Sequence, residues 1–433
     1  MSIIVIVMIV GTGFCLAWAR PYYFVILYCL LGCSYDSFAI TSFLNEHLKY
    51  YSFFMQLILA IAFVRAMIHF YYRKKIAGEK GIILWLTLFN VGIIFSTILF
   101  SIVGAGGYNV ALQSIYNLAS FSGIATIIWI SYNDIPGLKM VFKKLMIVQI
   151  ILSLLIIYLP VMGINGLEFI NGKNYLDSEE YNYRVVTLFN VKELLRNKYY
   201  FNKTAQFHNA NAVGFYGGVF AFIYICDFLK LRKNQILSSL LGIAVGILIW
   251  MHNGIRGVMI GIIAALMYGL ISKKKIGEKI VYIYMLICVC MGALVLLPTV
   301  RNIMAYMVVG RNAKAVQERV DLLVAALEFL KSNFWLGNGG LLGNLVAEGI
   351  DPHQLPARIA VLFGVPMGVL TIIILYVVPI VYYIRAKRVT IYSLGLIFII
   401  WMVSITNNYT CIVLFWLCFA EAFNEILWGQ KEG

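Results

Sequence analysis

The residue of this sequence best suited to general-base chemistry is a histidine that precedes a long apolar run. His353 lies in the segment Gly349-Ile-Asp-Pro-His353-Gln354, and it is the only histidine of the polar stretch 298–358. An imidazole titrates near pH ~6.5 and can therefore accept a proton from a hydroxyl group at neutral pH. Its position at the border of an apolar run indicates a catalytic base, and a structural or solvated histidine is the alternative.

Two arginines are placed to bind a phosphate group. Arg256 stands between glycines in Gly254-Ile-Arg256-Gly257, where a bulky group can approach the backbone, and a guanidinium offers paired donors to phosphate oxygens. Arg319 opens a segment of helical periodicity, where its charge opposes the helix dipole unless an anion lies nearby. The alternatives are a membrane-surface anchor for Arg256 and a solvated helix face for Arg319.

The composition excludes a soluble globular enzyme. Hydrophobic residues make up 62% of the 433 residues and charged residues 12%, whereas soluble domains average roughly 45–50% and roughly 25%. The same excess of apolar residues excludes a disordered chain. The eight cysteines lie in or beside apolar runs without a CxxC pair, which argues against a disulfide framework and against a zinc site. We therefore expect an all-α polytopic membrane protein with a single integral membrane domain, residues 1–433.

The apolar runs predict about 12 to 13 transmembrane helices, since a span needs ~20 mainly apolar residues. They are Ile3–Ala19, Tyr22–Ile40, Phe53–Phe70, Ile82–Val103, Ala111–Ile130, Leu145–Met162, Ala212–Leu229, Leu237–Met251, Gly257–Ile271, Ile280–Leu297, Ile359–Ile384, Ile391–Ile405 and Cys411–Ile426. The first two are close together and Leu237–Met251 is short, so the number could be twelve.

The basic residues, which give a net charge of +15, predict the orientation of these spans. They cluster in alternate connections, at Arg73-Lys74-Lys75, Lys139/Lys143/Lys144, Lys230/Arg232/Lys233, Lys273-Lys274-Lys275 and Arg385/Lys387/Arg388. Because positive loops stay in the cytoplasm, the C-terminus is expected inside and two large loops, 163–211 and 298–358, outside. The second loop contains an amphipathic helix with apolar residues from Val320 to Leu330, ended by turns over Asn333–Gly340. This helix is expected to lie on the membrane surface or to pack against the bundle.

Three stretches of the chain resemble the O-antigen ligase/polymerase superfamily, the Wzy- and WaaL-type integral membrane glycosyltransferases. The first is Phe207-His208-Asn-Ala-Asn211 with Gly214, similar to the "His-Pro-Asn" start of a span. The second is Gly254-Ile-Arg256-Gly257, similar to a "Ser-Arg-Gly" turn. The third is Arg319 with Leu336-Gly-Asn-Gly-Gly340, followed by His353-Gln354, nine residues and Gly364. Ala210 and Gly254 replace the usual Pro and Ser.

The resemblance implies a GT-C-like bundle that needs neither a metal nor a cofactor. Its donor and acceptor would be glycans on undecaprenyl diphosphate at the outer face of a bacterial inner membrane. His353 would activate the acceptor hydroxyl. The diphosphate would be bound by Arg256, Arg319, Lys203, Arg196, Arg311 and Arg358, with Asn211 and His208 beside it. A chain-length regulator and a flippase would be its partners, and no nucleic acid is expected.

The first functional reading is polymerisation of oligosaccharide repeat units into O-antigen, capsule or exopolysaccharide. The second is a ligase that transfers finished glycan to lipid A-core, because the two activities share a site and differ in acceptor. A flippase or other transporter is the alternative from another class. It is less favoured because the predicted spans carry few ionisable residues, Arg65 and Glu421 near their ends being exceptions.

The charge pattern yields a test of topology. Reporter fusions after Asp177 and after Glu328 are expected to report an outside location, and a fusion after Lys275 an inside location, because basic connections remain in the cytoplasm. Alkaline phosphatase and green fluorescent protein fusions measure this directly. If the fusions after Lys275 and Glu328 report the same side, the assignment of spans is wrong.

Overall fold

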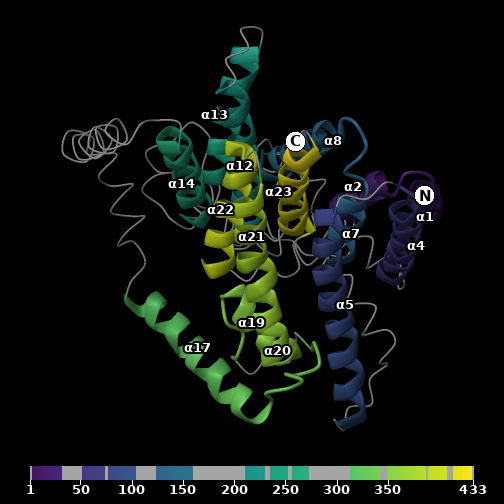
Figure 1. Ribbon diagram of the computed structural model, residues 1–433, viewed down its shortest axis with the longest axis vertical. Helices are drawn as coiled ribbons and strands as arrows, with labels where there is room; N and C mark the ends of the chain where they lie inside the picture. The colour runs from purple at the N-terminus through teal and green to yellow at the C-terminus, as the bar shows by residue number, and fades with distance from the viewer. Residues whose placement is uncertain are drawn as a thin grey trace.

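The computed structural model describes residues 2–31, 51–73, 77–103, 123–158, 210–229, 235–251, 256–272, 313–341, 349–386, 389–406 and 413–431. Within these ranges the chain is all-helical, without a strand (Figure 1). The predicted all-α class is therefore confirmed for this part of the chain. The predicted span Ile280–Leu297 and the first large loop up to residue 209 lie outside it.

The described ranges contain sixteen helical elements. In order they are α1 (Ser2–Ala19), α2 (Pro21–Leu31), α4 (Tyr51–Tyr72), α5 (Ala77–Val103), α7 (Gly123–Ser131), α8 (Leu138–Tyr158), α12 (Ala210–Phe228), α13 (Ile236–Met251), α14 (Arg256–Ser272), α17 (Ala313–Ser332), α19 (Leu355–Phe363), α20 (Val365–Ile372), the π-helical turn η5 (Ile373–Val377), α21 (Val378–Arg385), α22 (Ile391–Thr406) and α23 (Val413–Lys431).

Three stretches are long and apolar enough to cross a membrane: Phe54–Tyr72, Glu79–Val103 and Val365–Arg385. Six shorter apolar helices accompany them, at Val7–Ala19, Pro21–Leu30, Gly214–Phe228, Ile236–Trp250, Gly257–Gly269 and Ile391–Ile405. All nine overlap predicted spans. The amphipathic helix predicted in the second large loop is also confirmed, as α17, and turns follow it from Asn333 to Gly340. The prediction that Arg319 opens this helix is wrong, because α17 begins at Ala313 and Arg319 lies in its second turn, where the charge of the helix dipole is weak.

The prediction of one span over Ile359–Ile384 is wrong at its start. Gly364 has φ +95° and separates α19 from α20, so the apolar helix long enough to span begins at Val365. Its interior is irregular as well, because a π-helical turn over Ile373–Val377 loosens the usual hydrogen-bond ladder. The indole Nε1 of Trp401 donates to the carbonyl oxygen of Leu375 at 2.5 Å and stabilises this turn. Hydrophobicity alone did not reveal the break, because α19 is apolar too.

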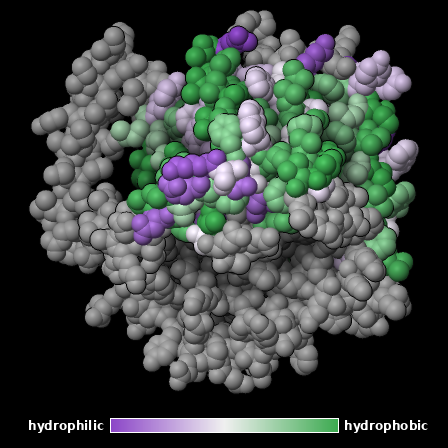
Figure 2. Space-filling view, turned by 90° about the horizontal axis from the view of Figure 1, so that it is seen from below, coloured by the Kyte–Doolittle hydropathy of each residue, from purple (hydrophilic) through white to green (hydrophobic). Residues whose placement is uncertain are grey.

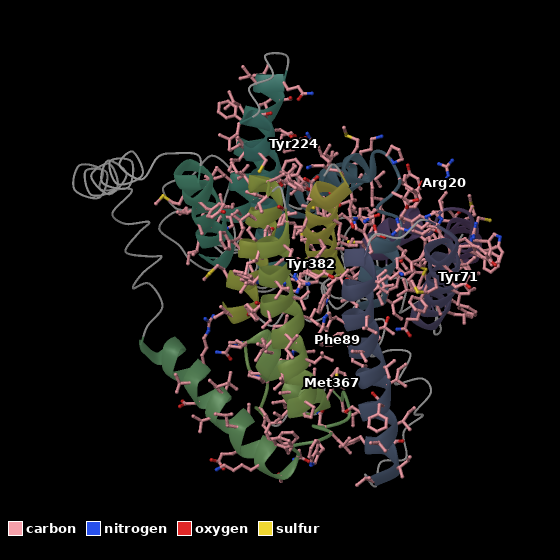
Figure 3. The ribbon with its side chains drawn as sticks, in the orientation of Figure 1. Arg20, Tyr71, Phe89, Tyr224, Met367 and Tyr382 are labelled. Atoms are coloured by element: carbon pink, nitrogen blue, oxygen red, sulfur yellow. The ribbon has the colours of Figure 1, made fainter. Side chains whose placement is uncertain are left out.

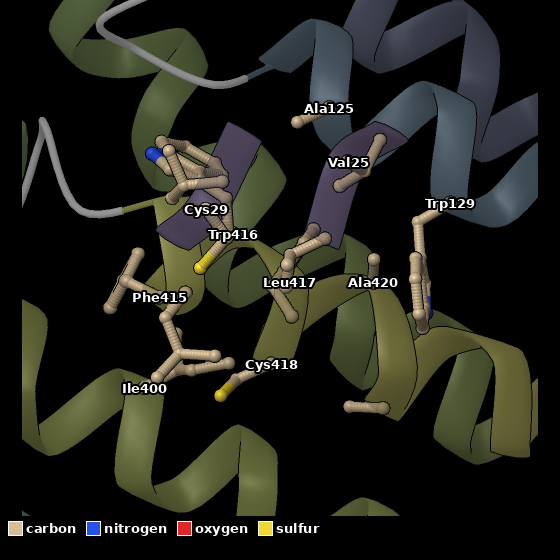
Figure 4. Close-up of a cluster of buried hydrophobic side chains, with 14 of the residues drawn as sticks. Val25, Cys29, Ala125, Trp129, Ile400, Phe415, Trp416, Leu417, Cys418 and Ala420 are labelled. Atoms are coloured by element: carbon tan, nitrogen blue, oxygen red, sulfur yellow. The ribbon is translucent and has the colours of Figure 1, made fainter. Parts of the chain in front are cut away.

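Helix α23 forms the centre of the apolar core. Figure 4 shows Trp129 of α7, Val25 of α2 and Ile400 of α22 arranged around it. Trp416 of α23 is almost completely buried there. Glu421 of α23 is buried beside this core, and its Oε2 accepts a hydrogen bond from Trp129 Nε1 at 3.0 Å.

Lysines of α8 join three helices at one end of the bundle. Lys139 lies 2.5 Å from the carboxylate of Glu425 of α23, and its ammonium group stands 3.8 Å from the ring centroid of Tyr392 of α22. One turn along α8, Lys143 forms an ion pair with Asp227 of α12. The ends of α12 and α23 and the start of α22 therefore meet the start of α8.

A buried ionic network holds α4 and α5 at the same end. Arg73 lies 2.8 Å from Glu79, which is 0% exposed, and donates to Asn133 and Asp134 at 2.8 and 2.9 Å. Asn133 in turn donates to Glu79 at 2.6 Å. Burial acts to raise the pKa of Asp134, but the hydrogen bond with His69 and the charge of Arg73 hold it below its ordinary value. The turn between α7 and α8 is thereby fixed to α4 and α5.

These contacts define two ends of the molecule. We name the end that contains Arg73, Lys139 and Lys143 the α8 end, and the opposite end, where α5 finishes at Val103, the α17 end. In Figure 1 the α8 end is uppermost and α17 lies at the bottom. The basic residues 73, 139 and 143, which the charge pattern assigns to one side of a membrane, therefore meet at one end of the bundle.

Replacing Glu79 by Gln tests the network. Removing one partner of a buried ion pair typically costs about 3–5 kcal/mol, and the low end is expected here because Asp134 still pairs with Arg73. Thermal unfolding of the purified protein in detergent measures the loss. The matched control is Lys331→Ala, which breaks a pair with Glu328 whose side chains are 70% and 62% exposed, and which should cost less than about 1 kcal/mol. Equal melting temperatures for Glu79→Gln and the wild type would contradict a structural role.

Candidate functional site

The glycine-rich turn after α17 is docked onto the end of α19. The backbone amides of Asn338 and Gly340 donate to the carbonyl oxygens of Val361 and Leu362 at 3.0 and 2.9 Å. Carbonyls in the last turn of a helix have no partner within the helix, and here the turn supplies one. The two halves of the third sequence motif, far apart in the chain, are thus one structural unit.

Glycine is required where this unit is tightest. A Cβ atom on Gly364, which has φ +95°, would lie 2.1 Å from the carbonyl oxygen of Trp335. A Cβ on Gly337, at φ +57°, would lie 2.3 Å from the carbonyl oxygen of Val361. A hydrogen bond from the amide of Val365 to the carbonyl oxygen of Phe334, at 2.7 Å, completes the junction. Backbone therefore packs directly on backbone between the turn and the start of α20.

Helix α5 supports the unit from its other side. The hydroxyl of Ser96 donates to the carbonyl oxygen of Leu336 at 3.1 Å. Along the same helix, Met367 of α20 lies against Gly92, and Tyr382 of α21 against Gly81 (Figure 3). The earlier glycine of α5, Gly81, meets the later residue Tyr382, and the later glycine, Gly92, meets the earlier residue Met367. Helices α20 and α21 therefore lie antiparallel to α5, and the glycine-rich turn lies at the α17 end.

The spacing between His353 and Gly364 is the length of a helix. His353 and Gln354 directly precede α19, whose nine residues occupy the whole interval to Gly364. Nine helical residues extend about 13 Å, so His353 and the glycine lie at opposite ends of a rigid rod. His353 is partly exposed, whereas the Oε1 atom of Gln354 is buried and has no hydrogen-bond partner among the described residues.

Arg358 is paired within the chain. Its Nε lies 2.8 Å from Oδ1 of Asp351, and its Nη2 donates to Oδ2 at 3.0 Å. The arginine is 7% exposed. This two-point contact joins the segment that contains His353 to the first turns of α19. The candidate phosphate ligand Arg358 therefore positions the histidine segment in this structure.

Arg319 lies on the side of α17 that faces the bundle. Ala326 and Leu330, seven and eleven residues later, share its helical face and are buried where α17 contacts α19. Arg319 itself is partly exposed. Seen from the α17 end, hydrophilic side chains gather near the middle of the view and hydrophobic ones border them (Figure 2). This end of the molecule thus combines a histidine, a bundle-facing arginine and a polar surface.

The structure does not describe the side chains of the other candidates. Arg256 and Asn211 belong to the first turns of α14 and α12, but their side chains are not described. Lys203, Arg196, Arg311 and His208 lie outside the described residues. Within the part of the chain that the structure covers, no three His, Cys, Asp or Glu side chains form a metal site.

Sequence reasoning named Gln354 as part of the third motif, but it missed Asp351 as a member of this site. An acidic residue just before a helix is a common signal, because a carboxylate is favourable near a helix N-terminus. That signal was present at Asp351, but it did not indicate the pairing with Arg358. Comparison with known proteins adds no family: no protein-family model and no curated protein sequence matches the chain.

Replacing Gly364 by Ala tests whether the junction is needed. The left-handed backbone costs an alanine of the order of 1–3 kcal/mol, and the contact with the Trp335 carbonyl oxygen forces a further shift. A lower melting temperature in detergent is therefore expected. The matched control is Gly11→Ala in α1, where nothing lies within 4 Å of the new Cβ and alanine is favoured in a helix by up to about 1 kcal/mol. Equal stability of Gly364→Ala and wild type would refute the close packing.

Proposed function

We propose that this chain is a multi-pass membrane glycosyltransferase that joins lipid-diphosphate-linked oligosaccharide repeat units into a polysaccharide. The observation that carries the proposal is the unit formed by His353, α19, Gly364 and the glycine-rich turn. It holds a base of suitable chemistry beside α17, which carries Arg319 on its bundle-facing side. The proposed location is the inner membrane of a bacterium, with the C-terminus in the cytoplasm.

The arrangement of the helices supports the membrane part of the proposal. Three candidate membrane spans and six shorter apolar helices fit a bundle of about 12 to 13 spans. The basic residues at the α8 end fit a cytoplasmic side, which leaves the His353 unit on the outer side. A GT-C-like enzyme acting on a lipid-linked donor needs its site at that border, where the diphosphate lies.

The chemistry follows from the residue types. The imidazole of His353 takes the proton from a hydroxyl of the acceptor sugar, and the hydroxyl oxygen forms a bond to the anomeric carbon of the donor. The bond between that carbon and the diphosphate oxygen breaks, and the diphosphate leaves with the electron pair. Arg319 and Arg256 stabilise the charge that develops on it, and each charge-assisted contact is worth roughly 1.5–3 kcal/mol.

The test is elongation of a lipid-linked repeat unit by purified protein, followed by mass spectrometry of the products. His353→Ala is expected to lower the rate by about 10²–10⁴-fold, because general-base help contributes that much. His353→Gln should fail equally if a proton is transferred. Arg319→Ala should also lose polymer, and Arg319→Lys should recover only part of it because lysine cannot bind two oxygens in a plane.

Two controls accompany this test. Each variant should unfold at the wild-type temperature in detergent, and Glu328→Gln, on an exposed face of the same helix as Arg319, should elongate normally. Full activity of His353→Ala would remove its catalytic role. Transfer of the glycan to lipid A-core without elongation would assign the ligase reaction instead, and movement of the lipid across vesicles without bond formation would assign a transporter.

A further inference from the structure

Helix α17 exposes an apolar flank beside the face that contacts the bundle. Ala326 and Leu330 are buried, whereas Val320, Val324 and Leu327 are 48%, 51% and 56% exposed. The exposed three are spaced by four and three residues and therefore form one stripe along the helix. We call this stripe the apolar flank. The exposed residues Asp321, Glu328 and Ser332 lie on the next side of the helix, which is polar.

The stripe continues into two aromatic residues after the helix. Phe334 is 45% and Trp335 is 73% exposed, and their rings meet edge to face at a centroid distance of 5.1 Å. Exposed apolar side chains gathered on both sides of Lys331 mark an interaction site. Tryptophan is enriched where apolar and aqueous surroundings meet, because its ring is apolar and its N–H needs a polar partner.

The position of this surface along the bundle indicates what covers it. Leu336, next to Trp335, accepts its hydrogen bond from Ser96, seven residues before the end of the candidate span at Val103. Seven helical residues correspond to about 10 Å, so Trp335 lies level with the outer part of that span. Figure 1 shows α17 slanting from this turn alongside the lower half of the bundle, level with the end of α5 rather than hanging below it.

The apolar flank is not isolated at this level. On α5, Phe95 and Ile98 are exposed, as are Ile102 and Val103 at its end. Lipid is the occupant that accounts for exposed apolar side chains on both a candidate span and a neighbouring helix at the same depth. Lys331, seven residues after Val324, lies in line with the apolar flank at the end of the helix, and its ammonium group pairs with Glu328 of the polar side. That polar side then faces headgroups and water.

We infer that Val320, Val324, Leu327, Phe334 and Trp335 form a lipid-contact surface that embeds α17 in the membrane leaflet at the α17 end. The second predicted loop is therefore partly a membrane-embedded element and not a wholly aqueous one. The inference rests on the membrane placement in the proposed function and is independent of glycosyl transfer. The partner of this flank is lipid, and neither a second copy of the chain nor another protein.

Photo-crosslinking in lipid nanodiscs tests the inference. The photoreactive residue p-benzoylphenylalanine is placed at Leu327 in the full-length protein, in nanodiscs of phosphatidylethanolamine and phosphatidylglycerol. The matched control is the same residue at Glu328, which is adjacent in sequence and points roughly 100° away around the helix. A third site, Phe95 on the candidate span α5, measures the yield of a lipid-facing position. Adducts are identified by the mass of the intact protein.

A lipid adduct at Leu327, with a yield near that at Phe95 and several-fold above that at Glu328, is expected. A crosslink from Leu327 to a second copy or to another part of the chain, or no adduct at all, would overturn the inference if Phe95 still yields lipid. If Phe95 also fails to yield lipid, the membrane placement itself is wrong. Because no sugar substrate is present, none of these outcomes depends on the proposed catalytic role of His353.

Discussion

The absence of a side chain at Gly364 is the constraint on which the arrangement of the candidate site depends. The carbonyl oxygen of Trp335 occupies the space in which a Cβ would lie, at 2.1 Å from that position. This contact joins the turn after α17 to the junction of α19 and α20. Because α20 is anchored along α5, the contact also fixes α19 and the His353 segment relative to the bundle. A larger residue at position 364 would push the turn after α17 away from the junction of α19 and α20.

The two ends of the bundle are held by different kinds of interaction. At the α8 end, ion pairs cross between helices, as in the contacts of Arg73 with Glu79 and of Lys139 with Glu425. At the α17 end, backbone hydrogen bonds and close packing at glycine join the elements. Buried charge pairs are costly to separate, whereas the junction at Gly364 depends on the close approach of one backbone segment to another. The two ends therefore respond to different substitutions: loss of a charge affects the α8 end, and an added Cβ atom affects the α17 end.

Several features were predictable from the sequence because they depend on local patterns. The helical class, nine of the apolar helices, α17 and its terminating turns follow from apolar composition and helical periodicity. The pairing of His353-Gln354 with Gly364 at a spacing of nine residues was visible as a motif, but its meaning was not. The structure explains it as the length of α19, a helix that hydropathy had merged with the following span.

Sequence by itself therefore determined the all-helical class of the described part of the chain and the clustering of basic residues such as Arg73, Lys139 and Lys143, and it predicted which residues are candidates for the chemistry. Only the tertiary structure decided that the glycine-rich turn and the His353 segment form one unit, that Arg358 is engaged by Asp351, and that α17 keeps an apolar flank exposed. The physical reason is that periodicity and composition act between near neighbours in the chain. Close backbone approaches, buried ion pairs and exposed flanks are settled by segments that meet only when the chain is folded.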